Sequence, residues 1–162
     1  MVPILLLLRA ETPAQIAAAA PLYLFGFTYL WVGINGFTGR EARGLGWFSL
    51  FVALAAVGFS WHSLVIVGDP TFAVIWLYWA MLWGLFFVVL GLERVELTAF
   101  TGWVTVVQGF VTAAIPAFLI LVERWNPGDA IAIGLIALAL VVFGGLWSAR
   151  DRLSVRPLPE AG

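Results

Sequence analysis

Residues 70–92 read PTFAVIWLYWAMLWGLFFVVLGL and lie between Asp69 and Glu93. None of these 23 residues is charged, and almost all of them are apolar. About 20 apolar residues in a helix are enough to cross the hydrocarbon core of a bilayer. The strands of a membrane barrel are about half as long and alternate between polar and apolar residues, which this stretch does not. It therefore predicts a membrane-spanning helix.

Four further charge-free stretches of similar length occur along the chain. They contain 28, 25, 26 and 20 residues and occupy positions 12–39, 44–68, 97–122 and 130–149. Together the five stretches predict spanning helices at about 17–37, 46–67, 71–92, 101–122 and 130–149. The predicted fold class is an all-α, multi-pass transmembrane helix bundle.

The overall composition agrees with a membrane protein and excludes several other classes. Of the 162 residues, 63% are hydrophobic and only 10% are charged, with a net charge of −1. A soluble domain carries about 25% charged residues, so an ordinary soluble globule is excluded. No surplus of positive charge exists to bind nucleic acid. The absence of cysteine excludes disulfides, iron–sulfur clusters, cysteine-ligated zinc and thiol catalysis.

The residues that catalysis requires are also missing. The chain has a single histidine, His62, no carboxylate in any predicted span, and no phosphate-binding loop or nucleophile elbow. We therefore expect no enzymatic activity, cofactor or metal. Ion-coupled transporters usually carry ionisable side chains within their spans, because a charge must be handled there. A bundle without such groups suits either a structural role or the passage of a neutral solute.

Aromatic residues recur at helical spacing on two predicted spans. Residues three or four positions apart share one face of a helix. The commoner role of such a row is packing between helices, and the alternative is a slot in which indole faces stack on a planar, neutral solute. A hydrated ion would find no charge there to replace its water. The residues are Phe72, Trp76, Trp79 and Trp83 on the third span, and Phe25 and Tyr29 on the first.

Two amides stand out among the polar residues of the spans. Gln108 lies within the fourth span, where an unpaired amide is costly, so it requires either a helix–helix hydrogen bond or a cavity. Asn35 lies near the end of the first span, where we expect its side chain to cap the helix. Pro116 is expected to kink the fourth span because it removes a backbone hydrogen bond.

The arginines indicate how the spans are oriented. All eight basic residues are arginines, and six of them fall on alternate loops: Arg40, Arg43, Arg94, Arg150, Arg152 and Arg156. The positive-inside rule places these loops in the cytoplasm, with the N-terminus outside and the C-terminus inside. We expect residues 1–16 to form a short apolar segment and an outer loop, residues 17–149 the five-helix domain, and residues 150–162 a disordered cytoplasmic tail.

Several short motifs identify a resemblance. The first span carries Gly-Phe-Thr-Tyr-Leu at 26–30, and the third carries a Trp-x-x-Trp-x-x-x-Trp ladder at 76–83. Gly-Trp-Phe-Ser-Leu-Phe at 46–51, Phe-Thr-Gly-Trp at 100–103, Gln-Gly at 108–109 and Ile-Pro-Ala-Phe at 115–118 accompany them. Residues 20–122 thereby resemble the AmiS/UreI family of urea and short-chain amide channels.

The resemblance implies a six-helix protomer, a hexameric ring and an aromatic-lined, urea-sized pore through each protomer. The matching pore positions are Phe25, Tyr29, Phe72, Trp76, Trp79 and Trp83, and Gln108 falls where some members carry glutamate. The family begins with two further helices, and residues 1–8 resemble the end of the second. Acid-gated members carry histidines in their outer loops, which the predicted outer loops here lack.

These observations predict a passive channel for urea or a small amide such as acetamide. It would lie in the cytoplasmic membrane and supply a cytoplasmic urease or amidase. The alternative is a non-transporting membrane scaffold or a truncated, inactive channel homologue.

Overall fold

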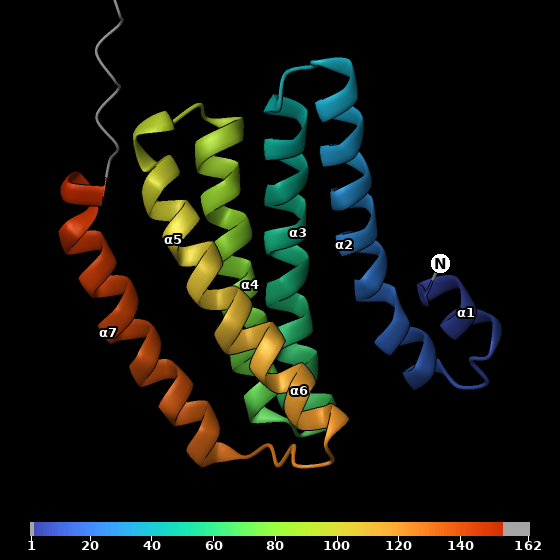
Figure 1. The fold of residues 1–162 in the computed structure, drawn as a ribbon. Coiled ribbons are helices and arrows are strands. Elements are labelled where there is room, and N and C mark those ends of the chain that lie inside the picture. Colours follow the sequence, from blue (N-terminus) through green and yellow to red (C-terminus); the bar gives the residue numbers. More distant parts are fainter. Residues whose placement is uncertain (1, 154–162) are drawn as a thin grey trace, which may run out of the picture.

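The computed structural model describes residues 2–153, which contain five helical segments long enough to cross a membrane. They are Pro13–Thr38, Arg43–Val67, Pro70–Gly91, Val95–Leu121 and Asp129–Leu153, running in alternating directions (Figure 1). No strand occurs among the described residues. The all-α, five-span prediction is therefore confirmed, with boundaries a few residues from those expected.

The spans are built from several helical elements. Helix α1 (Val2–Leu8) precedes the first span and packs against α2 (Pro13–Thr38). The second span is α3 (Arg43–His62) with the π-helical η1 (Ser63–Val67), and the third is α4 (Pro70–Phe86) with the π-helical η2 (Phe87–Gly91). The fourth comprises η3 (Val95–Leu97), α5 (Thr98–Gln108), the π-helical η4 (Gly109–Ala114) and α6 (Ile115–Leu121). The fifth is α7 (Asp129–Leu153). Residues 154–162, most of the predicted tail, lie outside the described residues.

Local sequence signals explain where α2 begins and ends. The Thr12 hydroxyl accepts a hydrogen bond from the Gln15 backbone N–H at 3.3 Å, and the Gln15 side-chain oxygen accepts one from the Thr12 N–H at 3.1 Å. This reciprocal pair is a capping box, and Pro13 follows it at the first helical position. The helix ends at Gly39, whose φ of 63° is a left-handed conformation that glycine adopts without strain.

The most extensive helix pair, α3 with α4 and η2, forms the centre of the bundle. Its tightest crossing joins Gly46 to Gly91, where a Cβ on Gly46 would lie only 2.1 Å from the Gly91 backbone nitrogen. At the other end of the pair, the Ser60 hydroxyl donates a hydrogen bond to the Ala73 carbonyl at 2.8 Å. Small residues and hydroxyl groups thus hold these two helices together, as is usual between spans.

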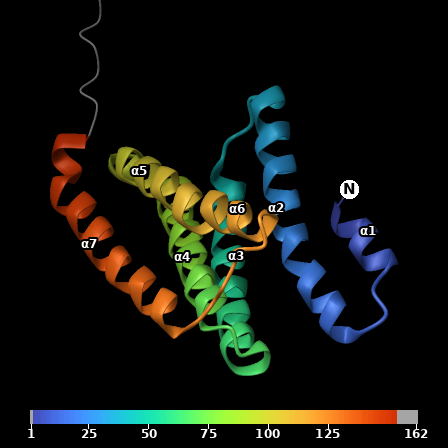
Figure 2. The same cartoon turned by 60° about the horizontal axis from the view of Figure 1, so that its bottom comes forward.

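Helix α7 packs on the side of α4 and α5, and Figure 2 shows it diverging from them. The Tyr78 hydroxyl of α4 donates a 2.6 Å hydrogen bond to the Leu135 carbonyl of α7. The Thr71 hydroxyl exchanges two hydrogen bonds with the backbone of Gly128, directly before α7, at 2.9 and 3.1 Å. These contacts fix α7 to the third span. Most of its surface remains exposed in this chain.

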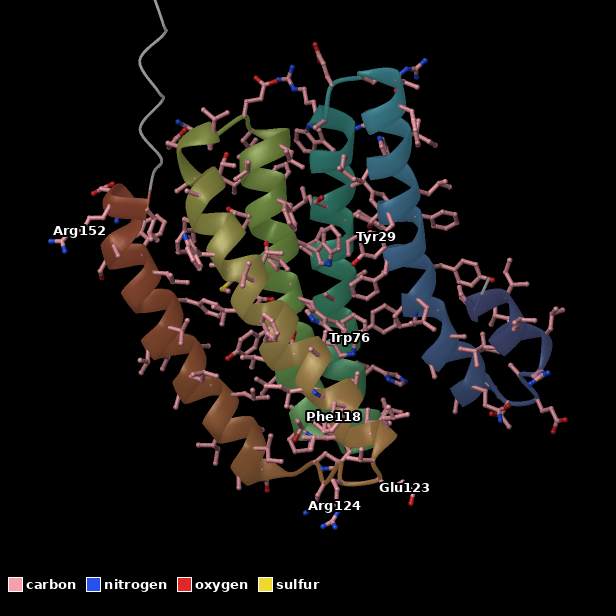
Figure 3. The ribbon with its side chains drawn as sticks, in the orientation of Figure 1. Tyr29, Trp76, Phe118, Glu123, Arg124 and Arg152 are labelled. Atoms are coloured by element: carbon pink, nitrogen blue, oxygen red, sulfur yellow. The ribbon has the colours of Figure 1, made fainter. Side chains whose placement is uncertain are left out.

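The arginine-rich loops lie at one end of the bundle. The end of α2, the start of α3, the end of η2, the start of η3 and the end of α7 lie toward that end (Figure 1). Glu123 and Arg124 lie at the opposite end, after α6 (Figure 3). Five of the six arginines lie toward this end, namely Arg40, Arg43, Arg94, Arg150 and Arg152, whereas Arg156 lies outside the described residues.

Candidate functional site: an aromatic cavity between the spans

A cavity of about 610 Å³ lies between α2 and α3 on one side and α4, α5 and η4 on the other. Its wall is mainly apolar and aromatic, with a few hydroxyl groups and one amide. The lining residues include Phe25, Thr28, Tyr29, Ser49, Trp79, Trp83, Phe86, Thr105, Gln108 and Thr112. None of the described residues that line it is charged.

Five of the seven predicted pore residues line this cavity: Phe25, Tyr29, Trp79, Trp83 and Gln108. Phe25 forms the centre of the aromatic group, because its ring meets Trp79 edge-on with centroids 5.2 Å apart and lies 6.2 Å from Trp83. Tyr29 lies on α2 beside the gap to α3 (Figure 3) and is 74% exposed. It therefore forms the open rim of the cavity.

The other two predicted residues, Phe72 and Trp76, do not line the cavity. The Trp76 ring stacks on Phe59 of α3, with centroids 4.9 Å apart, and meets the edge of Trp79. Phe72 packs against Trp125 in the loop before α7, with centroids 5.7 Å apart. Packing between elements thus accounts for the first half of the aromatic row, and the cavity begins at its second half.

A chain of hydrogen bonds fixes the polar side of the cavity. The Trp79 indole N–H donates to the Thr112 hydroxyl at 2.9 Å, and that hydroxyl donates to the backbone carbonyl of Gln108 at 2.8 Å. Thr112 begins the turn before Pro116, whose missing N–H removes one backbone hydrogen bond. The widened π-helical turn η4 ends at Ala114, and Pro116 lies in the first turn of α6; π-helical turns are common at functional sites.

The Gln108 side chain is the unusual group in the cavity. It is 1% exposed, and neither its amide nitrogen nor its amide oxygen has a hydrogen-bonding partner among the described residues. The helix–helix hydrogen bond considered from the sequence is therefore not made. An unpaired buried amide costs about 1–3 kcal/mol, so this residue of the cavity wall keeps one donor group and one acceptor group without a protein partner.

Thr28 and Ser49 also line the cavity, although neither was predicted from the sequence. Both hydroxyls donate to a carbonyl of their own helix, at Leu24 (2.7 Å) and Leu45 (2.8 Å), which leaves only the oxygens available as acceptors. Their one signal in the sequence is a hydroxyl in an otherwise apolar stretch. Because such hydroxyls also pair within their own helix, that signal does not distinguish a cavity from a packed interface.

Comparison with known proteins identifies the family of the chain. The model of the AmiS/UreI family transporters matches residues 1–124, which include the whole cavity wall. The chain belongs to the AmiS/UreI family. This confirms the resemblance drawn from the Gly-Phe-Thr-Tyr-Leu run and the tryptophan ladder. No solved structure matches the chain.

Named relatives of this AmiS/UreI protein are transporters and channels. A protein of Mycolicibacterium smegmatis named "putative amidate substrates transporter protein" is 51% identical over 141 residues, covering 86% of this chain and 66% of the relative. "Putative transporter protein AmiS2" of Rhodococcus erythropolis is 48% identical, covering 89% and 70%. The "acid-activated urea channel" of Helicobacter pylori strain J99 is 37% identical, covering 63% and 57%. The chain thus spans about two thirds of the first two relatives.

Proposed function

We propose that this AmiS/UreI protein is a passive channel for urea or small neutral amides, and that the cavity is part of the conducting path. The observation that carries the proposal is the unpaired Gln108 amide in an aromatic cavity without charged lining residues. The relatives named as an amidate substrate transporter and a urea channel support the same solute class.

The chemistry of the cavity suits a planar primary amide. The Gln108 amide can donate to the carbonyl oxygen of urea or acetamide and accept from its NH₂ group. The faces of Trp79 and Trp83 supply apolar contact to a flat molecule, while the indole N–H of Trp79 is already occupied by Thr112. An ion would lose its hydration without gaining a compensating charge, so it is excluded.

The wider setting follows from the arginines and from the family. The protein lies in the cytoplasmic membrane, with the end that carries Arg40, Arg43 and Arg94 in the cytoplasm. It assembles as a homo-oligomer, a hexameric ring as the family resemblance implies, and its solute supplies a cytoplasmic urease or amidase. The residues before Pro13 lie on the outer side, ahead of the first span.

Stopped-flow light scattering on proteoliposomes tests the transport function. We expect urea and acetamide to equilibrate at least several times faster across vesicles that contain the protein than across empty ones. Trp79→Ala and Trp83→Ala should change the rate or the ratio between the two solutes. Trp103→Ala is the matched control, because Trp103 is about half exposed and lies outside the cavity wall.

A non-transporting scaffold is the second candidate. The observation that favours it is the open rim at Tyr29, which leaves one side of the cavity without a protein wall in this chain. This candidate predicts equal solute flux with and without the protein, although the protein inserts correctly. Equal flux would therefore overturn the channel proposal and leave the scaffold.

A further inference from the structure

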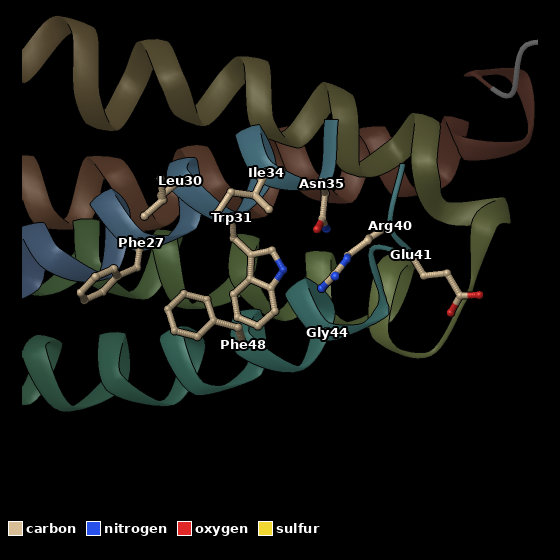
Figure 4. A pocket seen from close by; sticks show the side chains of 9 residues that line it. All are labelled: Phe27, Leu30, Trp31, Ile34, Asn35, Arg40, Glu41, Gly44 and Phe48. Atoms are coloured by element: carbon tan, nitrogen blue, oxygen red, sulfur yellow. The ribbon is translucent and has the colours of Figure 1, made fainter. Parts of the chain in front are cut away.

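A second hollow, of about 530 Å³, lies on the other face of α2 (Figure 4). Each helical residue advances by about 100°, so Phe27, Trp31 and Ile34 lie roughly opposite the cavity-lining face of α2. The hollow is closed on its second side by Gly44 and Phe48 of α3. It lies at the end of the spans where the chain turns through Arg40.

Three residues that line this hollow carry hydrogen-bond donors without a partner in the described part of the chain. The Asn35 side-chain nitrogen is buried and unpaired, and neither the Trp31 indole N–H nor the Arg40 guanidinium bonds to any of residues 2–153. The cap expected from Asn35 is not made by its side chain, since the Gly39 N–H donates instead to the Asn35 backbone carbonyl at 2.9 Å. Figure 4 shows the Arg40 guanidinium extending toward Asn35, whereas the Glu41 carboxylate points away.

The neighbouring arginines behave differently. Arg43 lies 3.8 Å from a Glu93 carboxylate oxygen, and Arg94 lies 3.8 Å from one of Glu96. Arg40 has no carboxylate within that distance in the described part of the chain. Its positive charge is therefore available for an anion from outside the chain.

Apart from Glu41, whose carboxylate points away, the rest of the lining is apolar and runs along α2 into the membrane-spanning region. Phe27 and Leu30 are 54% and 59% exposed. The Trp31 ring lies against α3, where a Cβ on Gly44 would come within 3.0 Å of its Cζ2 atom, and it packs on Phe48 with centroids 5.6 Å apart. The missing side chain at Gly44 thus leaves room for the Trp31 ring to pack against α3.

We propose that this hollow binds a membrane phospholipid, with the phosphate held by Arg40, Asn35 and Trp31 and an acyl chain along Phe27 and Leu30. Phosphate oxygens only accept hydrogen bonds, and a guanidinium matches them in charge and shape. Tryptophan is enriched at the depth of lipid headgroups. A soluble phosphate would leave the apolar half uncovered, so the bilayer is the source of the ligand. The site is independent of solute transport through the opposite face of α2.

Native mass spectrometry of the detergent-purified protein tests this site. The probes are dioleoyl phosphatidylglycerol, dioleoylglycerol of the same chain length without phosphate, and inorganic phosphate as competitor. We expect the wild type to retain the phospholipid over the diacylglycerol. Arg40→Ala and Asn35→Leu should each weaken retention about tenfold, the scale of a lost charge-assisted hydrogen bond. Trp31→Phe keeps the ring, removes only the N–H and should weaken retention less.

Arg152→Ala is the matched control, because it removes the same charge from an arginine outside the hollow at the end of α7 (Figure 3). Circular dichroism establishes that each variant is folded. The proposal is overturned if Arg40→Ala and Arg152→Ala retain phospholipid equally, or if millimolar inorganic phosphate displaces it. It is also overturned if a cross-linker attached at Phe27→Cys captures a second copy of the chain instead of lipid in a bilayer.

Discussion

At the scale of single residues, the sequence identified the aromatic row but not the neighbours of each ring. Helical spacing places Phe72, Trp76, Trp79 and Trp83 on one face of α4. Different elements meet that face along its length: the loop before α7 meets Phe72, α3 meets Trp76, and the cavity begins at Trp79. Periodicity defines a face, whereas the occupant of each part of that face is set by residues far away in the sequence.

Replacing Gln108 by leucine should separate function from stability. The change removes an amide that has no protein partner and keeps a side chain of similar size. We expect urea flux in proteoliposomes to fall, because the solute loses its donor and acceptor. The free energy of unfolding should not fall, and it should rise by up to about 1–3 kcal/mol, the cost of an unsatisfied buried group.

Thr101→Val is the control for this pair of measurements. The Thr101 hydroxyl is also buried and unpaired, but the residue does not line the cavity. Thr101→Val should therefore raise or preserve the free energy of unfolding and leave urea flux unchanged. A drop in the stability of Gln108→Leu, with flux preserved, would assign Gln108 to packing.

At the scale of helices and helix pairs, the charge-free stretches located all five spans to within a few residues. Ionisable side chains are excluded from the bilayer core, so their positions mark the span ends directly. The π-helical turns were not predicted, apart from a distortion expected at Pro116. Such turns depend on how a helix packs against its neighbours. That packing leaves no periodic pattern in the sequence.

The Gly46–Gly91 crossing should not tolerate a side chain. A Cβ at position 46 would overlap the backbone of Gly91, which cannot move aside as a side chain does. We expect Gly46→Ala to lower the free energy of unfolding by about 1–3 kcal/mol, the usual cost of overpacking. Reversible unfolding in mixed micelles measures the change.

Gly102→Ala provides the comparison for that crossing. Nothing lies within 4 Å of a Cβ at position 102. Alanine there should be neutral or stabilise the helix by up to about 1 kcal/mol through its higher propensity. Equal losses at positions 46 and 102 would contradict the close crossing.

The attachment of α7 depends on a hydrogen bond from the third span. Tyr78→Phe removes the hydroxyl that donates to Leu135 at 2.6 Å and keeps the ring that packs on Phe143. We expect a loss of about 0.5–1.5 kcal/mol in the free energy of unfolding and faster proteolysis in the loop before α7. Tyr23→Phe is the control, because its hydroxyl bonds to no described residue. Similar losses in both variants would contradict this role.

At the scale of the whole molecule, the sequence predicted a charge-free interior, and the structure shows a cavity without charged lining residues. The position and shape of that cavity could not be predicted. They depend on the distance in space between α2 and the pair α5 and η4. In the sequence, two other spans lie between these elements.

This interior leads to a prediction about ions. Vesicles containing the protein should conduct urea without carrying current, because a charge entering the cavity would lose its hydration at a cost of several kcal/mol or more. Planar-bilayer recordings in potassium chloride, made with the preparation that conducts urea, should show no conductance above the lipid alone. A steady ohmic current that requires the protein would contradict a path for neutral solutes.

The widened turn at Gly109–Ala114 limits how the length of the fourth span can vary. Each helical residue accounts for about 100° of rotation about the helix axis. Removing one residue here would therefore rotate every side chain of α6 by about that angle relative to Gln108. Exchanging one side chain for another leaves that phase unchanged. Homologous chains should therefore keep the length of this turn constant, while residue type can vary at exposed positions outside the cavity wall, such as Phe110.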